Sequence, residues 1–446
     1  MLKVLLSGLL LPISVFAEVN FDGNKNNIKE TMINVETPAP QVSKATKTTK
    51  EWTIMVFLNA KNDLERFGIS DMNEMETVGS NDNLNIVVQM GRIKGYDSSN
   101  GDWTGVRRYY VTKDTDRSII NSQLIENMGE VDMGSYKTLI DFAKWAKKTY
   151  PAKKYALVIW NHGSGWEKGF KSSVTKGISY DEQSGNHINT PQLGMAMKEI
   201  GKVDILDFDA CLMQMAEVAY EIKDYVTYIV ASEETEPGDG DSYDGFLAKL
   251  VANPTMGPLE LAKAIVDAYS SYYSQKGEGT TKSVIRAEQM PGLLDAVNNF
   301  AYALSQSNDK TAIKNAASSA QSYAISDNKD LYHFAKLLSN SNNAEVKAKS
   351  QALMDFIKNK LVAYNKTTNG GYSWYGSSDY SNSYGIAIYL PSYSVASGYT
   401  DLQWSKYSNW DEFLVWYTGK DATTTTTTPS TPSTGSYYDW LFGGKI

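Results

Sequence analysis

Short apolar runs alternate with helical patterns through the first half of the chain, and this alternation constrains the fold more than any other feature. The runs are typical of buried strands, and between them apolar side chains recur at the spacing of one helix face. The runs lie at residues 53–58, 84–90, 155–160, 203–208 and 225–231. Strands separated by helices predict a mostly parallel sheet with helices on both of its faces. We therefore expect an α/β fold.

Two reactive side chains lie directly after strands of this predicted sheet. His162 follows the run 155–160, and Cys211 follows the run 203–208. In parallel sheets, binding and catalytic residues gather outside the carboxyl ends of the strands. Cys211 is the only cysteine of the chain, so it forms no disulfide within it. A free cysteine is often buried and inert, but this pair of positions favours a thiol nucleophile with its base.

The neighbours of the pair provide ways to activate it. A helix predicted to begin just after Cys211, and the imidazole of His162, would both favour the thiolate. Gly163 permits a tight turn and can present its N–H to a developing oxyanion, as can the amide of Cys211. No third residue that would orient the histidine is apparent. The other histidines are interpreted as structural, His187 as solvated and His333 as packed.

Several carboxylates accompany the pair. Asp209 is predicted to lie in a pocket beside Cys211 and to bind a cationic substrate side chain, whereas Asp207 is interpreted as capping a turn or a helix. The loop 233–241 carries further acids and is open to three interpretations: a solvated loop, a calcium site or an acidic pocket wall. Its spacing is not that of an EF-hand, because Leu250 occupies the position of the expected Glu. The sequence therefore requires no cofactor, and calcium stays open.

Charge and the N-terminus limit the partners and the location. A formal net charge of -8 over 446 residues argues against a nucleic-acid partner, because phosphate binding requires clustered Lys and Arg. Residues 1–17 combine Lys3, an apolar run and a small-residue cleavage site, which is the pattern of a signal peptide. That run is too short to span a bilayer comfortably, and no second run qualifies as transmembrane. We therefore expect a secreted protein, either extracellular, periplasmic or at the cell surface.

Composition divides the rest of the chain into four parts. Residues 18–50 are polar and are expected to form a disordered leader. Residues 51–255 hold the reactive pair and are predicted to form a catalytic domain. Residues 256–420 are predicted to form a mixed region of helices and strands. Residues 421–446 contain a Thr- and Pro-rich linker and a short aromatic tail.

Several of these segments together resemble a known family. The matching segments are 58–64, 160–163, 209–211, 231–238, 330–332 and 385–391. They resemble the clostripain-type cysteine peptidases, the C11 family of clan CD, whose fold is caspase-like. His162 and Cys211 are 49 residues apart, a separation comparable with that in the caspases. The resemblance implies a caspase-like, mostly parallel sheet flanked by helices, followed by a mixed C-terminal region.

The resemblance also implies an activity and a role for each site residue. Members of the family are endopeptidases that cleave protein or peptide substrates after Arg or Lys. His162 and Cys211 would form the catalytic dyad, and the N–H of Gly163 would help to bind the oxyanion. Asp209 would lie in the pocket for the basic side chain, and Asp239 would be a second acid there.

Family members can mature by self-cleavage between the histidine and the cysteine, and we favour Lys176 as the cleavage site in this chain. Some members require calcium, which the sequence does not decide. Two other functions stay open. A non-catalytic secreted surface or glycan-binding protein would account for the 29 Tyr and 10 Trp. A clan CD peptidase of other specificity, for Asp or Asn, is the second, although an acidic pocket disfavours such side chains.

Overall fold

Five parallel strands form the centre of the fold. We describe it from a computed structural model, which covers residues 49–166, 177–307, 309–373 and 376–420. The five strands are β1 (Lys50–Ala60), β2 (Leu84–Arg92), β5 (Ala152–Trp160), β8 (Val203–Asp209) and β9 (Val226–Ala231). Each overlaps one of the predicted apolar runs, and they pair in parallel in the order β9-β8-β5-β1-β2. The predicted α/β fold with a mostly parallel sheet is therefore confirmed.

Antiparallel strands extend this sheet at both edges. β3 (Gly105–Tyr110) and β4 (Gln123–Gly129) follow β2, and β10 (Thr280–Arg286) and β12 (Val362–Thr368) follow β9. The complete order is β12-β10-β9-β8-β5-β1-β2-β3-β4. No apolar pattern in the sequence marks β4, because its side chains are mostly exposed. β10 and β12 come after residue 255, so the sheet itself crosses the predicted boundary between the two regions.

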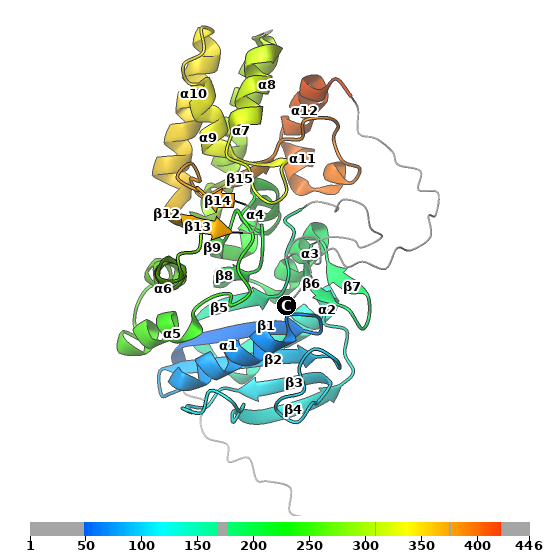
Figure 1. The fold of residues 1–446 in the computed structure, drawn as a ribbon, viewed down its shortest axis with the longest axis vertical. Coiled ribbons are helices and arrows are strands. Elements are labelled where there is room, and N and C mark those ends of the chain that lie inside the picture. The colour runs from blue at the N-terminus through cyan, green and yellow to red at the C-terminus, as the bar shows by residue number, and fades with distance from the viewer. Residues whose placement is uncertain (1–48, 167–176, 308, 374–375, 421–446) are drawn as a thin grey trace, which may run out of the picture. The chain divides into compact units, whose positions relative to one another are not determined.

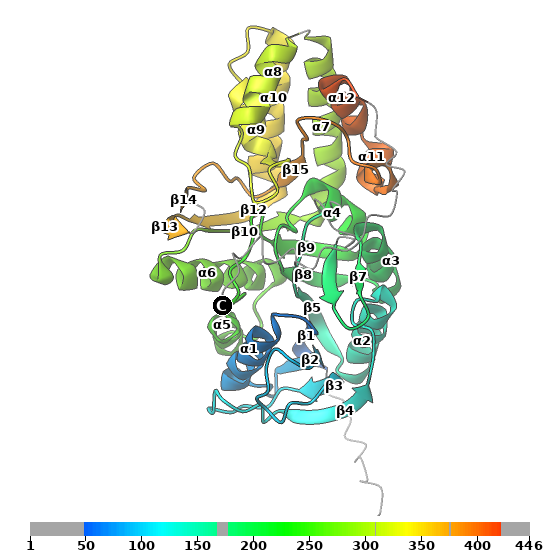
Figure 2. The same ribbon diagram turned by 45° about the vertical axis from the view of Figure 1, so that its right-hand side comes forward.

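Helices cover both faces of the sheet, as Figures 1 and 2 show. One face carries α1 (Glu65–Val78), α5 (Tyr243–Ala252) and α6 (Pro258–Lys276), and the other α2 (Tyr136–Thr149), α3 (Thr190–Ile200) and α4 (Ala216–Ile222). Successive side chains of a strand point to opposite faces, so each strand supplies both cores. In β1, Val56 and Leu58 pack with the first set of helices, and Met55 and Phe57 pack with the second.

Local sequence signals mark the ends of several helices. The Ser135 side chain caps α2 by accepting a hydrogen bond from a first-turn N–H. α3 begins with a capping box formed by Asn189 and Gln192, and Pro191 lies in its first turn. Gly79 follows α1 with a φ of 70°, a conformation that favours glycine. Local sequence signals therefore mark where these three helices begin or end.

The C-terminal region is mixed, as predicted, and its helices stand above the sheet in Figure 1. They share a hydrophobic core with α4. These helices are α7 (Met290–Gln306), α8 (Lys310–Ser319), α9 (Leu331–Leu338), α10 (Ala344–Phe356), α11 (Gln403–Tyr407) and α12 (Trp410–Thr418). Short 3₁₀ turns occupy Lys223–Tyr225, Ala287–Gln289 and Tyr399–Asp401, and a π-helical turn occupies Ile357–Leu361. None of the helices in the described ranges is long and apolar enough to cross a membrane.

Three two-stranded sheets lie outside the central one. They are β6 (Ile178–Asp181) with β7 (Asn186–Ile188), β11 (Asn328–Asp330) with β15 (Ala387–Tyr389), and β13 (Gly370–Ser373) with β14 (Gly376–Ser378). The first of these follows His162 in the chain and packs beside the end of β1, where it supports the site described below. The predicted signal peptide, residues 18–48 of the predicted leader, the predicted tail and the predicted cleavage residue Lys176 lie outside the described residues. Lys50, the last residue of the predicted leader, is instead the first residue of β1.

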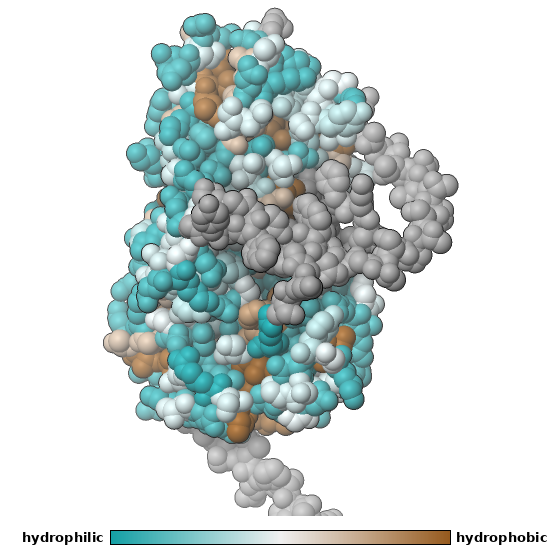
Figure 3. Space-filling view, in the orientation of Figure 1, coloured by the Kyte–Doolittle hydropathy of each residue, from teal (hydrophilic) through white to brown (hydrophobic). Residues whose placement is uncertain are grey.

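The face of the molecule seen in Figure 3 is largely hydrophilic, and the hydrophobic areas on it are small and separated. Many of the described aromatic side chains are buried in the hydrophobic cores. Every tryptophan whose side chain is described is buried or half-buried. The described tryptophans therefore contribute to core packing, whereas Tyr96, Tyr302, Tyr393 and Tyr407 are exposed.

Candidate active site

A cavity of about 140 Å³ opens at the carboxyl ends of the central strands. Its walls come from the segments that directly follow β1, β5, β8 and β9. The lining residues are Asp63, Leu64, Phe67, Trp160, Asn161, His162, Asp209, Ala210, Cys211, Glu236, Pro237, Gly238 and Gly240. This is the edge at which open α/β sheets bind their ligands. The structure therefore brings the predicted pair, His162 and Cys211, to one cavity.

Cys211 lies in the cavity wall and is 7% exposed. Its sulfur accepts a hydrogen bond from the N–H of Glu236 at 3.3 Å. Burial raises the pKa of the thiol to about 12, and the N–H groups of Glu236 and Gly163 lower it only in part. In this resting arrangement the residue is a thiol, so a base has to take its proton when a substrate arrives.

The sequence predicts that a helix begins directly after Cys211, and this prediction is wrong. Leu212 has a φ of 64°, in the left-handed region, which stops a helix from starting there. The helix α4 begins only at Ala216, and it contains seven residues. No helix N-terminus therefore supports the thiolate at Cys211, and the backbone N–H groups of neighbouring segments take that role.

His162 has an orienting partner that the sequence interpretation missed. Its Nε2 lies 2.7 Å from Oδ1 of Asp63, on the segment that follows β1. A carboxylate only accepts, so Nε2–H donates to Asp63 and this contact fixes the orientation of the imidazole ring. The signal for Asp63 was its place directly after the strand 53–58, at the same sheet edge as the pair.

Asparagine side chains shape the turn that carries Asp63. Asn62 accepts the N–H of Leu64 at 3.0 Å and donates to the carbonyl of Tyr180 at 3.0 Å. Asn161, beside the histidine, donates to the carbonyl of Asn59 at 2.5 Å. The turn after β1 is thus tied both to β6 and to the residue that precedes His162.

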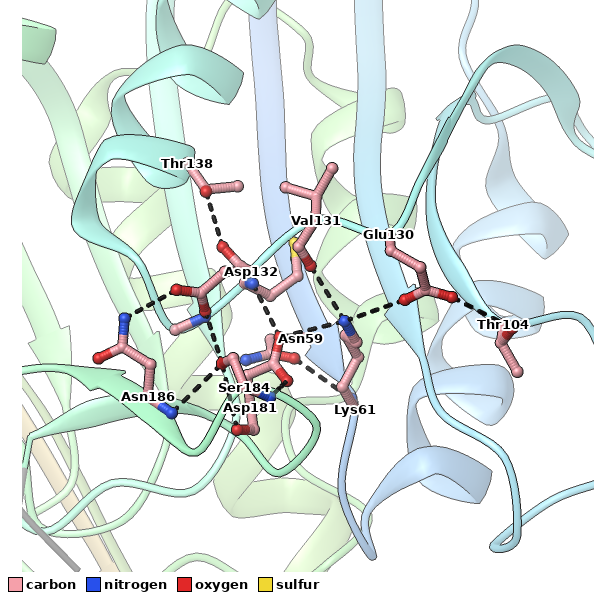
Figure 4. A network of polar contacts seen from close by, with 12 residues as sticks. Asn59, Lys61, Thr104, Glu130, Val131, Asp132, Thr138, Asp181, Ser184 and Asn186 are labelled. Carbon is pink, nitrogen blue, oxygen red and sulfur yellow. Dashed lines mark hydrogen bonds and ion pairs between the residues drawn. The ribbon is translucent and has the colours of Figure 1, made fainter.

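A buried lysine within the same turn, Lys61, ties the turn to its neighbours, as Figure 4 shows. Lys61 is 2% exposed, and its ammonium lies 3.3 Å from the carboxylate of Asp181 at the end of β6. It also donates to the carbonyl of Val131 at 3.0 Å. Asn59 in turn donates to the hydroxyl of Ser179. These contacts fix the end of β1 against the β6–β7 hairpin and so set the position of Asp63.

Gly163, the predicted oxyanion donor, packs closely against Cys211. A Cβ on this residue would lie 2.5 Å from the carbonyl oxygen of Cys211, so only glycine fits without movement. Its N–H faces the sulfur of Cys211 and lowers the pKa of the thiol. The N–H of Ser164, the next residue, donates to the carbonyl of Gly177 at 3.1 Å and holds this segment in place.

Asp209 also lines the cavity and is 5% exposed. The hydroxyl of Tyr243 donates to Oδ2 at 2.9 Å, and the N–H of Asp241 donates to Oδ1 at 3.2 Å. Burial and the carboxylate of Asp241 raise the pKa of Asp209 to about 7. A Cβ on Gly240 would lie 2.6 Å from Oδ1 of Asp209, so the loop approaches the carboxylate through a glycine.

A second layer of buried charge lies behind Asp209. The ammonium of Lys282, on β10, lies 3.0 Å from Glu236, 3.1 Å from Asp241 and 3.7 Å from Asp207. The interpretation of Asp207 as a cap is therefore wrong: its carboxylate accepts no hydrogen bond from the described residues and faces this lysine. The lysine could not be anticipated, because it belongs to a strand distant in sequence.

The acidic loop after β9 is not a solvated loop. Glu233, Glu234, Glu236 and Asp241 are each less than 9% exposed. No group of three or more His, Cys, Asp or Glu side chains in the described residues has the geometry of a metal site. Of the three interpretations of this loop, the acidic pocket wall agrees with the geometry, since Glu236 lines the cavity.

Asp239 lies apart from the other acids and is not among the lining residues. Its carboxylate forms an ion pair with Lys276 and accepts a hydrogen bond from the hydroxyl of Tyr272 at 2.8 Å. Burial opposes ionisation, but Lys276 and Tyr272 outweigh it and lower the pKa of Asp239. A substrate cation would therefore have to compete with Lys276 for this carboxylate.

The two other histidines, His187 and His333, do not line the cavity. His187 is 8% exposed and stacks on the ring of Tyr180, so its interpretation as solvated is wrong. Its position on the short strand β7 turns it inward, which the polar loop around it in the sequence does not reveal. His333 accepts the N–H of Gln321 at 2.9 Å, in agreement with a structural role.

A cysteine and a histidine that line one cavity at the carboxyl edge of a parallel sheet are the arrangement expected of a thiol hydrolase with a caspase-like fold. The sequence model of the clostripain family of peptidases matches residues 56–417. The chain therefore belongs to the clostripain family of cysteine peptidases.

One curated relative shares moderate sequence identity with the chain. The chain is 27% identical over 261 residues to clostripain of Hathewaya histolytica, a match that covers 53% of this chain and 48% of that protein. The chain thus spans about half the length of this curated relative.

Solved structures share the fold. One is a secreted C11 cysteine protease of Bacteroides thetaiotaomicron with an irreversible peptide inhibitor, at 22% identity and a TM-score of 0.62, covering 81% of this chain and 100% of that one. Another is an inactive zymogen C11 protease of Parabacteroides distasonis, at 20% identity and a TM-score of 0.60, covering 80% and 98%. Both likenesses support the caspase-like arrangement of the sheet.

Proposed function

We propose that the chain is a secreted cysteine endopeptidase that cleaves proteins or peptides after Arg or Lys. The observation that carries this proposal is one cavity lined by a cysteine, a histidine and a buried aspartate, Cys211, His162 and Asp209. The first two provide a nucleophile and a base, and the third provides a negative site within the same cavity. A cationic side chain is the ligand that a buried carboxylate favours most.

The proposed reaction begins with proton transfer. When the substrate binds, Nδ1 of His162 takes the proton of the Cys211 thiol, and Asp63 stabilises the resulting imidazolium through Nε2. The thiolate attacks the carbonyl carbon of the scissile bond, and its oxygen becomes an oxyanion that the N–H groups of Gly163 and Cys211 stabilise. The imidazolium then protonates the leaving amine, and the C–N bond breaks to leave a thioester.

The second half of the reaction reverses these roles. A water molecule gives a proton to His162 and attacks the thioester carbon. The C–S bond breaks, the thiol of Cys211 is regenerated by the imidazolium, and the product acid leaves. The N–H of Glu236 donates to the sulfur and favours the thiolate, but burial outweighs it, so the resting thiol is protonated.

Specificity in this proposal comes mainly from Asp209. The carboxylate lies in the cavity wall and accepts two hydrogen bonds that fix its direction. Asp239 remains a second proposed acid at the rim, with a weaker contribution because Lys276 occupies it. An Asn side chain would gain no ion pair there, and an Asp side chain would meet like charge at Asp209.

Maturation and secretion extend the proposal. We propose self-cleavage between His162 and Cys211, at Lys176, and export by the signal peptide 1–17. Gly177, the residue after the proposed cut, begins the described segment that pairs with the histidine loop. A relative described as an inactive zymogen and another described as secreted support both steps.

A panel of reporter peptides tests the proposal. The peptides vary only the residue before the cut: Arg, Lys, Gln, Asp or Asn. We expect hydrolysis after Arg and Lys at least about 100-fold faster than after Gln, since a buried charge pair contributes ~2–5 kcal/mol. Cys211→Ala should abolish hydrolysis and remain a single chain. Equal rates across the panel would disprove basic specificity, and unchanged rates in Cys211→Ala would disprove the thiol mechanism.

A further inference from the structure

The charged group that lies behind the cavity, rather than in it, has no role in the mechanism above. We propose that Lys282 is a positioning residue for substrate specificity: its buried ammonium keeps Asp209 ionised and thereby sets the pH range in which the cavity accepts a basic side chain. The inference rests on the proposed function, in which Asp209 binds the side chain before the cut.

The position of Lys282 is determined from several sides. The side chain is 1% exposed on β10 and does not line the cavity. Its ammonium donates to the carbonyl of Phe208, the residue before Asp209, at 3.1 Å. It also donates to Glu236, whose backbone N–H binds the sulfur of Cys211. One ammonium thus contacts the strand that carries Asp209 and the loop that carries the sulfur's partner.

The buried carboxylates around this lysine lack other partners. Both oxygens of Asp207 and of Asp241, and Oε2 of Glu236, accept no hydrogen bond from the described residues. Buried carboxylates without hydrogen bonds are strongly disfavoured unless a cation compensates them. Lys282 is the cation within 4 Å of all three. Its charge therefore offsets part of the cost of burying these three carboxyl groups.

Asp209 belongs to the same electrostatic system. Burial and the charge of Asp241 oppose its ionisation, whereas Lys282 and the Tyr243 hydroxyl favour it. Groups on the surrounding elements also face this system. These are Asp71 and Glu74 of α1, Asp207 of β8, Glu236 and Asp241 after β9, Tyr243 of α5, and Tyr269 and Tyr273 of α6. Among these groups, every carboxyl opposes a negative charge on Asp209, and Lys282 supports it.

Removal of Lys282 is expected to weaken the binding of an Arg side chain, although the loss of a positive charge near the cavity would by itself be expected to strengthen it. A cation behind an acidic pocket would be expected to weaken the binding of a cationic side chain. Here the substrate reaches Asp209 from the cavity, whereas Lys282 acts from behind and contacts the carboxylate cluster directly. Without the ammonium, Asp209 keeps its proton to higher pH, and a protonated acid offers the cation no charge. Removal of the lysine should therefore reduce the acceptance of Arg.

Two substitutions with opposite predictions test the inference. Lys282→Met removes the cation with little change in shape. Asp241→Asn removes a repelling carboxylate and keeps the backbone N–H that donates to Asp209. For each protein we would measure kcat/KM between pH 5 and 9 on two peptides that differ only in Arg or citrulline before the cut. The ratio of the two values cancels the titration of Cys211 and His162, and its midpoint reports Asp209.

We expect the midpoint of the Arg-to-citrulline ratio to lie near pH 7 in the parent protein. It should rise by at least one unit in Lys282→Met and fall in Asp241→Asn. A rise of one unit lowers the ratio about tenfold on the acid side. A purely structural role would lower activity on both peptides together and would move no midpoint. If Lys282→Met does not fold, as judged by circular dichroism, Lys282→Gln replaces it as the neutral variant, with the same expected rise of the midpoint.

Two results would overturn the inference. One is a Lys282→Met midpoint that does not rise above that of the parent, and the other is an Asp241→Asn midpoint that does not fall below it. If the parent protein prefers Arg but neither substitution changes the midpoint, the proposed function stays intact and only the role of Lys282 is disproved. A parent that shows no preference for Arg over citrulline at any pH would remove both.

Discussion

The two walls of the cavity use carboxylates in contrasting settings. On the histidine side, the side chain of Asp63 is 34% exposed and contacts the imidazole of His162. On the opposite side, Asp209 is 5% exposed and belongs to a buried cluster with a lysine behind it. The same residue type thus orients a base in one wall and offers a negative site in the other. Burial and partners, rather than residue type, decide which role a carboxylate can take.

The contrast has an electrostatic consequence. A half-exposed carboxylate keeps its solvent and can stabilise an imidazolium without strongly repelling other charges. A buried carboxylate is costly in the absence of a cation, so it gains most when a cationic ligand arrives. The histidine wall should therefore affect the chemical step, and the acidic wall should affect which substrates are accepted.

Asp209→Asn should give the largest effect. The amide keeps the shape but removes the charge, so kcat/KM for an arginyl peptide should fall about 10²- to 10³-fold, since loss of one partner of a buried charge pair costs ~2–5 kcal/mol. A citrulline peptide should change by less than about threefold, because it makes no ion pair. Steady-state kinetics on the two peptides would measure this. Equal losses on both would contradict a specificity role.

Asp63→Asn should have the next largest effect. The amide no longer stabilises the imidazolium, so kcat should fall about 10- to 100-fold, a part of the ~10²–10⁴-fold that general acid–base catalysis supplies. KM should stay nearly constant for both peptides. Glu182→Gln is the matched control, because Glu182 is exposed near His162 but accepts its hydrogen bond from Tyr96. Similar losses in the two variants would argue against a specific Asp63 contact.

Asp239→Asn should have a small effect on the same peptides. Its carboxylate is already paired with Lys276 outside the cavity lining, so kcat/KM for the arginyl peptide should fall about two- to fivefold, as for an exposed ion pair worth ~0–1 kcal/mol. The comparison with Asp209→Asn on the arginyl peptide is the measurement. A loss as large as that of Asp209→Asn would show that Lys276 releases Asp239 to the substrate.

Glu217→Gln should leave the activity unchanged and alter only the stability. Glu217 is buried away from the cavity and accepts hydrogen bonds from the Tyr389 N–H and the Tyr399 hydroxyl, and burial raises its pKa to about 7. The native state therefore holds a proton that the unfolded chain loses near pH 4, so parental stability should fall as the pH rises from about 4 to 7.

The amide of Glu217→Gln does not titrate, so comparing this variant with the parent at two pH values tests the prediction. Urea unfolding should give a similar free energy for parent and Glu217→Gln at pH 4.5, and a variant more stable by roughly 1–3 kcal/mol at pH 8. A difference that is the same at both pH values would mean that the carboxyl does not titrate with folding. The result would also show whether a buried carboxyl without a lysine behaves differently from the cluster around Lys282.

Much of the fold follows from local patterns. The apolar runs of the central strands and the cap at Ser135 are local signals, and each appears in the structure. β4 escapes such reasoning because an exposed edge strand has no apolar pattern. The false helix start after Cys211 has a local cause too, because nothing in a leucine announces the left-handed backbone of Leu212.

The candidate site was predictable only where sheet topology carries residues to a common edge. His162, Cys211 and Asp209 follow parallel strands, so their convergence could be inferred from sequence order and the rule for strand ends. Asp63 satisfies the same rule, and only its contact with the imidazole was missing. Lys282 satisfies no such rule, because it lies on an antiparallel strand whose neighbours are set by long-range pairing.

The sequence by itself determined the class of the sheet, the two reactive side chains and the edge at which they meet, because strand periodicity and chain order are local properties. Only the tertiary structure decided the state of each charge. Ionisation depends on burial and on partners from distant segments, and Asp63, Asp209 and Asp239 are alike as residues but differ in both. The pairing of β10 with β9 places Lys282 behind the cavity, and no pattern within either strand encodes that contact.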